Sequence, residues 1–433
     1  MKYHSTRAAS PPVSLAQAIV AGLAPDGGLY VPDALPQRRP DDFDGAETLV
    51  VVGQRLLEPF FAGDRLERDL PAILGSAMDF EAPCKPLRGT PGPASVLELF
   101  HGPTCAFKDF GARFLAQCLP RLPEQDGRPL TILVATSGDT GGAVAAAFHR
   151  CPGVDVAVLY PKGLVSERQA HHLACWGDNV RTFAVHGTFD ECQQLVKGAF
   201  RDPDMVERYR LSSANSINLG RLLPQMVYYA RTSLDLWRQH GVRPNFIVPS
   251  GNLGNVLACI WAREIGLPIG DIVLATNANL TVTEYLSDGE WRPRRSVATL
   301  ASAMDVGDPS NRERLRFMFP AIERLRSAIS ARSVSDQEIR ETIVRDAEEL
   351  GEIWCPHTAT AAHVYRQLAG DRAGEHWVLV ATAHPAKFND IVEPLIGREV
   401  PVPPELARLL ARPRIEQEIG PDLGELRRGL ARA

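Results

Sequence analysis

Short apolar runs, each followed by a loop of glycine and small polar residues, recur along the chain. Residues 131–135 (T-I-L-V-A) and 246–248 (F-I-V) are such runs, and an apolar helical stretch follows each of their loops. A third run, residues 377–381 (W-V-L-V-A), also ends in a polar loop. Unbroken apolar runs of this length are typical of strands that are buried on both faces of a parallel sheet. Their alternation with helical stretches predicts an open, mostly parallel α/β fold.

The same pattern predicts two α/β domains that follow an N-terminal cap. We expect helices at residues 15–21 and 66–74 of the cap, which should end in the proline- and glycine-rich stretch at 86–93. The predicted units are an N-terminal cap domain at 1–95, a first α/β domain at 96–230, a second at 231–400 with a helical insertion at about 280–350, and C-terminal tail helices at 401–433. The predicted strands are 131–135, 154–160 and 180–186 in the first α/β domain, and 245–249, 272–276 and 376–382 in the second.

Ligands of an open parallel sheet gather beyond the carboxyl ends of its strands, so the loops at these ends are candidate sites. The loop at 249–255 is rich in glycine and asparagine, which tolerate the backbone angles needed to aim several N–H groups at one anion. The helix that follows adds the positive end of its dipole. The residues predicted to bind a cofactor phosphate are Gly251, Asn252, Leu253, Gly254 and Asn255. The alternative is a glycine-rich turn without a ligand.

The loop at 136–142 offers similar geometry together with three hydroxyl groups and one acid. Its predicted substrate-binding residues are Thr136, Ser137, Asp139 and Thr140, which could hold the α-carboxylate of an amino acid. A carboxylate beside a bound carboxylate would be repelled. Asp139 therefore has a second interpretation, as a cap for the N-terminus of the helix that follows.

One lysine is a candidate for covalent chemistry. Lys108 lies just before a predicted helix and is flanked by Phe107 and Phe110. Desolvation by these aromatic rings would lower the pKa of its amine, and an unprotonated amine can attack the aldehyde of pyridoxal 5′-phosphate. The alternative is a solvated surface lysine, which is the commoner role for this residue type.

The third polar loop begins at Thr382, directly after the apolar run at 377–381. The Thr382 hydroxyl could hydrogen-bond the pyridine nitrogen of the cofactor as a neutral partner. The alternative is a hydrogen bond back to the main chain. His384 and Lys387 follow in the same loop and are further candidates, although a structural hydrogen bond is the commoner role for a histidine at a strand end.

These motifs, in this order, carry a resemblance that covers nearly the whole chain. The chain resembles the threonine synthases of the longer microbial and fungal type, within the fold type II family of pyridoxal phosphate enzymes. The matching stretches include H-G-P-T-C-A-F-K-D-F at 101–110, T-S-G-D-T-G at 136–141 and P-S-G-N-L-G-N at 249–255. Others are residues 3–7, 22–32, 160–163, 187–190, 215–218, 303–305, 309–311, 356–359 and 382–388.

The resemblance implies the conversion of O-phospho-L-homoserine and water into L-threonine and phosphate. By position, Lys108 resembles the Schiff-base lysine, the loop at 251–255 the cofactor phosphate loop, and Thr382 the partner of the pyridine nitrogen. The segment 137–140 resembles the one that meets the substrate carboxylate and the cofactor ring. The leaving phosphate needs donors of its own, because a dianion is costly to desolvate without partners. The predicted ligands of that phosphate are Lys162, Ser166 and Asn218, with Arg113 and Arg168 as further candidates.

Composition agrees with an enzyme of this kind and argues against other classes. A net charge of −5, with dispersed charges, gives no basic stripe for nucleic acid. The eight cysteines form no C-x-x-C pair and show no cysteine–histidine metal spacing, so we expect reduced thiols, no bound metal and a cytoplasmic protein. No apolar stretch of the sequence approaches membrane-spanning length, and we expect no membrane partner. The sequence leaves the oligomeric state undetermined.

Three other functions stay open at the level of sequence. A related phospholyase that releases 2-oxobutyrate would use the same cofactor residues. A nucleotide-binding phosphotransfer enzyme would also use glycine loops, but the pattern G-x-x-x-x-G-K-[ST] is absent. A non-catalytic metabolite sensor on the same scaffold would have no need of the covalent amine of Lys108.

Overall fold

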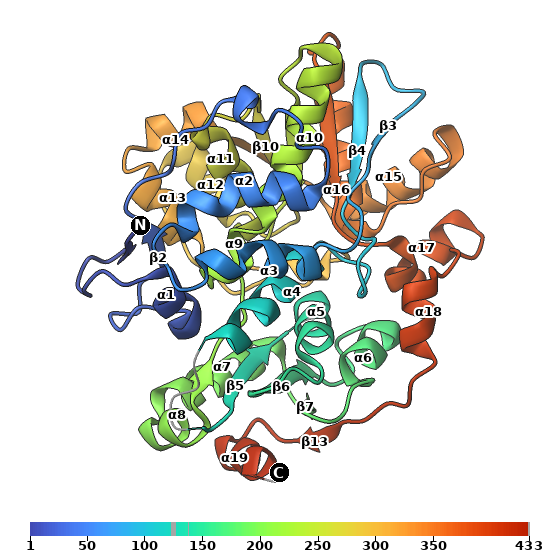
Figure 1. Ribbon diagram of the computed structural model, residues 1–433. Coiled ribbons are helices and arrows are strands. Elements are labelled where there is room, and N and C mark those ends of the chain that lie inside the picture. Colours follow the sequence, from blue (N-terminus) through green and yellow to red (C-terminus); the bar gives the residue numbers. More distant parts are fainter. Residues whose placement is uncertain (123–126, 137, 432–433) are drawn as a thin grey trace.

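A six-stranded sheet forms the larger part of the fold (Figure 1). The computed structural model describes residues 1–122, 127–136 and 138–431. The strand order in this sheet is β11 (Ser330–Ser333), β10 (Ile272–Thr276), β9 (Asn245–Pro249), β12 (Trp377–Ala381), β4 (Ala94–Glu98) and β3 (Cys84–Pro86). Neighbouring strands run parallel except β3 and β4, which are antiparallel. The carboxyl ends of the four central strands therefore meet at one edge of the sheet.

Helices cover both faces of the six-stranded sheet. Every residue of β9, β10 and β12 is buried, as their unbroken apolar runs predict. Alternate side chains enter two hydrophobic clusters: Ile247 and Leu379 join the cluster that contains α16 (Pro356–Ala369). Phe246 and Val378 join the cluster that contains α10 (Gln225–His240) and α11 (Gly254–Ile265). The sheet is thus the middle of three layers.

A second, five-stranded sheet lies below the first in Figure 1 and is parallel throughout. Its strand order is β13 (Gln417–Ile419), β7 (Val180–Val185), β6 (Val154–Pro161), β5 (Leu130–Ala135) and β8 (Leu211–Ser212). One face packs against α7 (Phe189–Arg201) and α19 (Leu423–Ala431). The helices α4 (Lys108–Cys118) and α5 (Asp139–Phe148) pack against each other between the two sheets.

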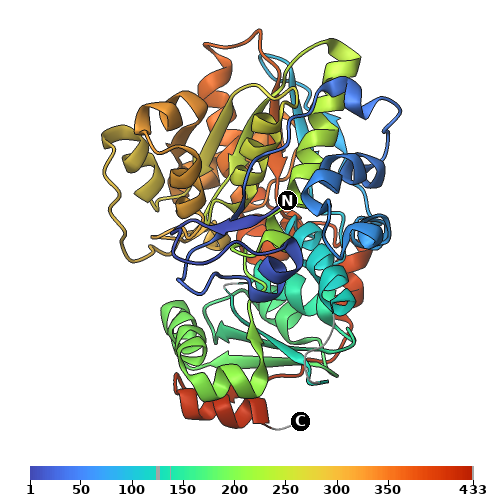
Figure 2. The same cartoon turned by 60° about the vertical axis from the view of Figure 1, so that its left-hand side comes forward.

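The N-terminal segment packs on the helices rather than on a sheet. It contains β1 (Tyr3–Ser5) and β2 (Tyr30–Pro32), which pair with each other, and the helices α1 (Leu15–Ala21), α2 (Leu49–Phe61) and α3 (Leu70–Ala77). Helix α2 contacts α10, and α3 contacts α4. Figure 2 shows this segment, drawn in blue, beside the upper part of the molecule and above the five-stranded sheet.

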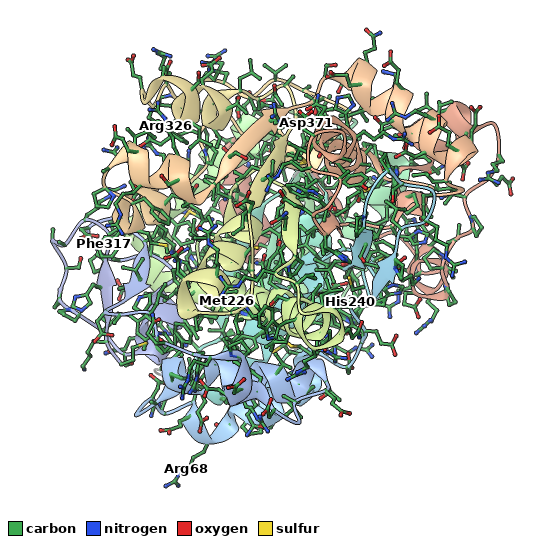
Figure 3. All side chains as sticks on the ribbon, turned by 90° about the horizontal axis from the view of Figure 1, so that it is seen from above. Arg68, Met226, His240, Phe317, Arg326 and Asp371 are labelled. Carbon is green, nitrogen blue, oxygen red and sulfur yellow. The ribbon has the colours of Figure 1, made fainter. Side chains whose placement is uncertain are left out.

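The remaining elements connect these layers. The α-helices among them are α6 (Glu167–Ala174), α8 (Pro203–Tyr209), α9 (Leu219–Leu222), α12 (Thr281–Asp288), α13 (Arg312–Met318), α14 (Ile322–Ala328), α15 (Asp336–Glu349), α17 (Asn389–Ile396) and α18 (Pro404–Leu410). The 3-10 helices are η1 (Pro40–Phe43), η2 (Glu67–Asp69), η3 (Leu119–Arg121), η4 (Ser302–Met304) and η5 (Pro385–Phe388). Figure 3 shows Phe317 of α13 and Arg326 of α14 at the outer edge of the molecule.

The sheets divide the chain differently from the predicted units at three places. Strands β3 and β4, at the end of the predicted cap, belong to the six-stranded sheet. Strand β11 lies within the predicted helical insertion and extends the same sheet. Strand β13 lies within the segment 401–433 that was predicted to form tail helices, and it pairs with β7. These strands lie at or near sheet edges and are short or partly polar, so they lack the unbroken apolar pattern that marks the central strands.

A buried arginine joins the N-terminal segment to the rest of the fold. Arg314 of α13 is 0% exposed. Its guanidinium donates to the carbonyl of Tyr30 at 3.0 Å, to the carbonyl of Ile217 at 2.6 Å and to Asn311 Oδ1 at 2.7 Å. Burial lowers the pKa of Arg314 to about 9. One side chain therefore satisfies acceptors from three parts of the chain.

Replacing this arginine by methionine, Arg314→Met, should lower the free energy of unfolding by about 3 kcal/mol, because three buried acceptors lose their donor. Urea unfolding followed by circular dichroism measures the change. Arg316→Met, an exposed position on the same helix, is the matched control and should stay within about 0.5 kcal/mol of the original chain. Equal stability of the two variants would contradict the role given to Arg314.

Candidate active site

Lys108 is the first residue of α4, the helix that packs with α5 between the two sheets. Its side chain is 14% exposed, and its Nζ lies 4.8 Å from the centre of the Phe107 ring. Burial, opposed in part by the carboxylate of Asp139, lowers the pKa of the Lys108 amine to about 8. The amine therefore loses its proton more easily than an exposed lysine, as the sequence predicts.

Main-chain pairing brings Lys108 next to Thr382. The Phe107 N–H donates to the carbonyl of Thr382 at 2.8 Å, and the His384 N–H donates to the carbonyl of Cys105 at 3.0 Å. Between them, Ala106 and Ala383 form an antiparallel bridge. The end of β12 thus holds the segment that presents Lys108.

Thr382 itself is buried, with 5% of its surface exposed. Its N–H donates to Thr358 Oγ1 at 3.3 Å, whereas its own hydroxyl makes no hydrogen bond to any residue that the structure describes. The back-bonding alternative is therefore not seen among these residues. The hydroxyl stays available for a ligand.

The loop after β9 has a backbone shaped for an anion. Leu253 has a φ of 62°, in the left-handed region, and Gly254 begins α11. The first-turn N–H groups of any helix have no intrahelical acceptor. Because no described side chain caps α11, these groups can bind an anion. A Cβ on Gly251 would lie 2.7 Å from the Cα of Met304, which explains the glycine there.

Two asparagines of this loop have different tasks. Asn252 fixes the loop to two other segments of the chain. Its Nδ2 donates to Ser216 Oγ at 2.7 Å, and its Oδ1 accepts from the Ser310 N–H at 2.6 Å. Asn255 Oδ1 accepts from the hydroxyls of Tyr228 and Tyr229, at 2.6 and 2.8 Å. Its Nδ2 is buried without a partner among the described residues. A buried donor beside a free helix N-terminus fits the phosphate of pyridoxal phosphate.

The loop after β5 is held by Thr136. Its Oγ1 accepts from the N–H groups of Gly138 at 3.0 Å and Gly141 at 2.9 Å, so this hydroxyl shapes the loop. Gly138 has a φ of 139°, a conformation that side chains rarely adopt. The hydroxyl of Thr140 has no partner among the described residues. Ser137, predicted to bind substrate, lies outside the described residues.

Asp139 is a buried ion-pair partner and not a helix cap. It is the first residue of α5, whose N-cap, Gly138, makes no side-chain cap. The Asp139 carboxylate lies 2.6 Å from Lys387 Nζ and 3.9 Å from Lys108 Nζ. Burial opposes ionisation of this carboxyl, but the two lysines outweigh it and lower the pKa of Asp139.

Three buried side chains near Asp139 were not predicted from the sequence. His357, at the start of α16, accepts from the Ala303 N–H at 3.0 Å, and burial lowers its pKa to about 4. Burial likewise lowers the pKa of His172 of α6 to about 3. His172 Nε2 and Gln169 Nε2 are buried and have no hydrogen-bond partner among the described residues. Both side chains come from α6: His172 lies against Gly142 of α5, and Gln169 lies against Gly138 of the loop before it. For Gln169 and His172 the signal in the sequence was a polar pattern on a short helix, which is usually a solvated face, and for His357 it was the matching stretch at 356–359.

The three predicted ligands of the substrate phosphate are placed differently. Lys162 follows β6 and forms an ion pair with Glu418 at 2.5 Å. Ser166 caps α6 by accepting from the Gln169 N–H at 3.2 Å. Both follow the carboxyl end of β6, the strand next to β5.

Asn218 differs from both because its amide is fully used. Its Nδ2 donates to the carbonyls of Ile19 at 2.8 Å and Ser213 at 3.2 Å, and its Oδ1 accepts from the Gly220 N–H at 2.9 Å. The geometry gives no support to a substrate contact at Asn218. This residue caps α9 and joins it to α1, because the N-cap position of a short helix demands such an acceptor. Arg113 is also occupied, by Asp79 at 2.6 Å.

Other kinds of site find no support in the described part of the chain. No cluster of three histidine, cysteine, aspartate or glutamate side chains there is arranged to hold a metal ion. Within the same residues, every helix is too short or too polar to cross a membrane. The contacts among Lys108, Asp139 and Thr382 define the candidate site, and Asn255 lies after β9, the strand next to β12.

Three family descriptions match this chain. Residues 95–383 match the pyridoxal-phosphate dependent enzymes. Residues 2–78 match the family described as threonine synthase N terminus, and residues 358–428 match that described as threonine synthase, C-terminal. The first match contains Lys108, the loop after β9 and Thr382. With this site and these sheets, the chain is a pyridoxal phosphate-dependent enzyme of fold type II.

Full-length relatives narrow this class, and the chain belongs to the threonine synthase family. The threonine synthase of Serratia marcescens is 40% identical over 433 residues, which cover 99% of each chain. The crystal structure of threonine synthase from Brucella melitensis with pyridoxal phosphate bound has a TM-score of 0.91 and 34% identity over 100% of both chains. The yeast threonine synthase structure has a TM-score of 0.90 and 30% identity, covering 100% of this chain and 98% of its own.

Proposed function

We propose that this chain converts O-phospho-L-homoserine and water into L-threonine and phosphate. Membership of the threonine synthase family supports this reaction. The observation that carries the proposal is the main-chain pairing between residues 105–107 and 382–384. It supports a single site that contains a buried lysine with a lowered pKa, Lys108, and a hydroxyl, that of Thr382, without a partner among the residues that the structure describes.

The cofactor site that we propose uses three parts of the chain. Pyridoxal phosphate, when bound, supplies an electron sink next to the amino group of the substrate. Lys108 would attach it, and the Thr382 hydroxyl would meet its ring nitrogen. Its phosphate would be held by the loop of Gly251, Asn252, Leu253, Gly254 and Asn255, where the buried Nδ2 of Asn255 lacks a described partner.

Lys108 would also move protons of the substrate. Because the reaction removes phosphate from Cγ and adds water at Cβ, protons must leave and return at Cα and Cβ. An amine with a pKa of about 8 can both accept and return protons near neutral pH. Its position at the start of α4, beside the end of β12, supports access to both carbons from one face.

The substrate groups would be bound beyond the ends of β5 and β6. The hydroxyl of Thr140, which has no partner among the described residues, and the N–H groups at the start of α5 support binding of the α-carboxylate. Asp139 repels that carboxylate less because Lys387 lies 2.6 Å away. Lys162 and Ser166 are the proposed ligands of the substrate phosphate, since an exposed pair such as Lys162–Glu418 is exchanged at little cost.

One assay separates the possible products. The purified, cofactor-loaded protein is incubated with O-phospho-L-homoserine while phosphate, threonine and 2-oxobutyrate are measured together. Phosphate and threonine in equal amounts are expected. Phosphate with 2-oxobutyrate would make the protein a phospholyase, and no phosphate release would refute the proposed substrate.

We also propose a cytoplasmic location. All eight cysteines are free in the structure, which agrees with a reducing compartment. The test is fractionation of the cells that produce the protein, followed by immunodetection. Recovery outside the cytoplasmic fraction would contradict the proposal.

Thr382→Val should lower turnover while leaving cofactor affinity nearly unchanged. Valine keeps the shape of threonine and removes only the hydroxyl that would meet the ring nitrogen. Loss of one such hydrogen bond should reduce kcat about tenfold or more. Steady-state kinetics and the wavelength of the cofactor's visible band measure the effect. Thr382→Ser is the matched control and should recover most of the activity, whereas an unchanged kcat in Thr382→Val would refute the contact.

A further inference from the structure

Two lysines share one buried carboxylate in the candidate site. Lys387 Nζ lies 2.6 Å from Asp139 Oδ1, and Lys108 Nζ lies 3.9 Å from Asp139 Oδ2. The side chains of Asp139 and Lys387 are 3% and 2% exposed, so neither charge is solvated. A buried charge needs a partner, and the shorter distance makes Lys387 the closer partner of Asp139.

Lys387 is held by the same segment that presents Lys108. Its Nζ donates to the carbonyl of Thr104 at 2.7 Å. Thr104 is fixed in turn by Asp109, which accepts from its N–H at 2.8 Å and from its hydroxyl at 2.7 Å. A Cβ on Gly102 would lie 2.5 Å from Asp109 Oδ2, so only glycine leaves room for this arrangement. The position of Lys387 is therefore built into the Lys108 loop.

The charged groups that face Lys108 come from four other elements. Asp139 comes from α5, Lys387 from η5 and Arg221 from α9, and Cys355 and His357 lie at the start of α16. Asp139 favours the protonated form of the Lys108 nitrogen, whereas Lys387 and Arg221 oppose it. Without Lys387, the nearest cation to Asp139 would be Lys108 itself.

We propose that Lys387 is a positioning residue: its ammonium neutralises Asp139 and so leaves the nitrogen of Lys108 free to lose its proton. This inference rests on the proposed attachment of the cofactor at Lys108. A purely structural ion pair would stabilise the fold without affecting the protonation of Lys108. The pH dependence of the Lys108 nitrogen separates the two interpretations.

The test is a pH titration of the visible absorbance band of the holoenzyme. Without Lys387, the negative charge of Asp139 is no longer neutralised. It then stabilises the protonated form of the Lys108 nitrogen. In Lys387→Met, the pH midpoint of the band should therefore rise by about one unit or more. Lys387→Arg keeps the charge and should have a midpoint close to that of the original holoenzyme. An unchanged or lower midpoint in Lys387→Met would overturn the proposal.

A second variant gives a result if Lys387→Met does not fold. Lys387→Gln keeps a polar side chain that can donate to Asp139 and to the carbonyl of Thr104, but it carries no positive charge. Its pH midpoint should also rise above that of the original holoenzyme, because the Asp139 charge is no longer neutralised. An unchanged or lower midpoint in Lys387→Gln would overturn the inference.

Borohydride reduction followed by peptide mass spectrometry separates this inference from the proposed function. A pyridoxyl group on Lys108 of the original holoenzyme is expected. Its absence would mean that the proposed function fails at its first step, whereas its presence together with an unmoved midpoint in Lys387→Met would overturn only the role of Lys387. A pyridoxyl group on Lys387 would overturn that role directly.

Discussion

Replacement of Lys108 by alanine should abolish covalent cofactor binding and lower kcat by about 10³-fold or more, because the attaching amine and the proton carrier are lost together. The fold should persist, since Asp139 keeps Lys387 as its partner at 2.6 Å. The measurements are the visible absorbance of the cofactor-loaded protein, the mass of the borohydride-reduced chain and the rate of phosphate release. Circular dichroism monitors the fold.

Lys197→Ala is the matched control for this experiment. Lys197 lies on α7 and is exposed, so its loss should leave absorbance and turnover unchanged. Retention of the reduced mass adduct or of full turnover in Lys108→Ala would remove the basis of the proposed mechanism.

Asn255→Asp should weaken cofactor binding about 100-fold or more, because a buried donor becomes an acceptor. The two tyrosine hydroxyls that donate to Oδ1 keep their acceptor, so the side chain stays in place. The new carboxyl either ionises and repels the cofactor phosphate or must bind a proton at a cost. Since ionisation increases with pH, the loss of affinity should also grow as pH rises. Fluorescence titration with pyridoxal phosphate at several pH values measures both effects.

The control for Asn255→Asp is Gln194→Glu, the same change from amide to carboxylate at an exposed position of α7. This control should bind the cofactor as the original chain does at every pH. Equal affinity of Asn255→Asp and the control would show that Nδ2 of Asn255 does not face the phosphate.

The central strands and the loops after them could be predicted because their signal is local. The runs at 131–135 and 377–381 are buried strands in the structure, and the loops that follow begin where the strands end. β13 could not be predicted in this way. Its three residues, Gln417 to Ile419, are mostly polar, and only the exposed edge of β7 makes them a strand.

The chemistry of single loops could be predicted better than the contacts between loops. Asp139 had two interpretations from the sequence, ligand or cap, because its neighbours in the chain allow both. The structure pairs it with Lys387. Asp139 follows β5 of the five-stranded sheet, whereas Lys387 follows β12 of the six-stranded sheet. Such a pair depends on how two sheets pack, and no local pattern encodes that. Asn218 shows the reverse case: it was predicted to be a ligand, and in the structure its side chain caps α9.

The late position of β13 in the chain bears on how the protein is made. Strand β7 ends at Val185, but among the described residues the strand that pairs with its outer edge is β13, residues 417–419. During synthesis, the ribosome must add more than half of the chain before that edge can pair. An open strand edge is a template for pairing with other chains, so nascent copies are exposed to aggregation for most of translation. Truncation just before residue 417 should therefore give a chain that aggregates.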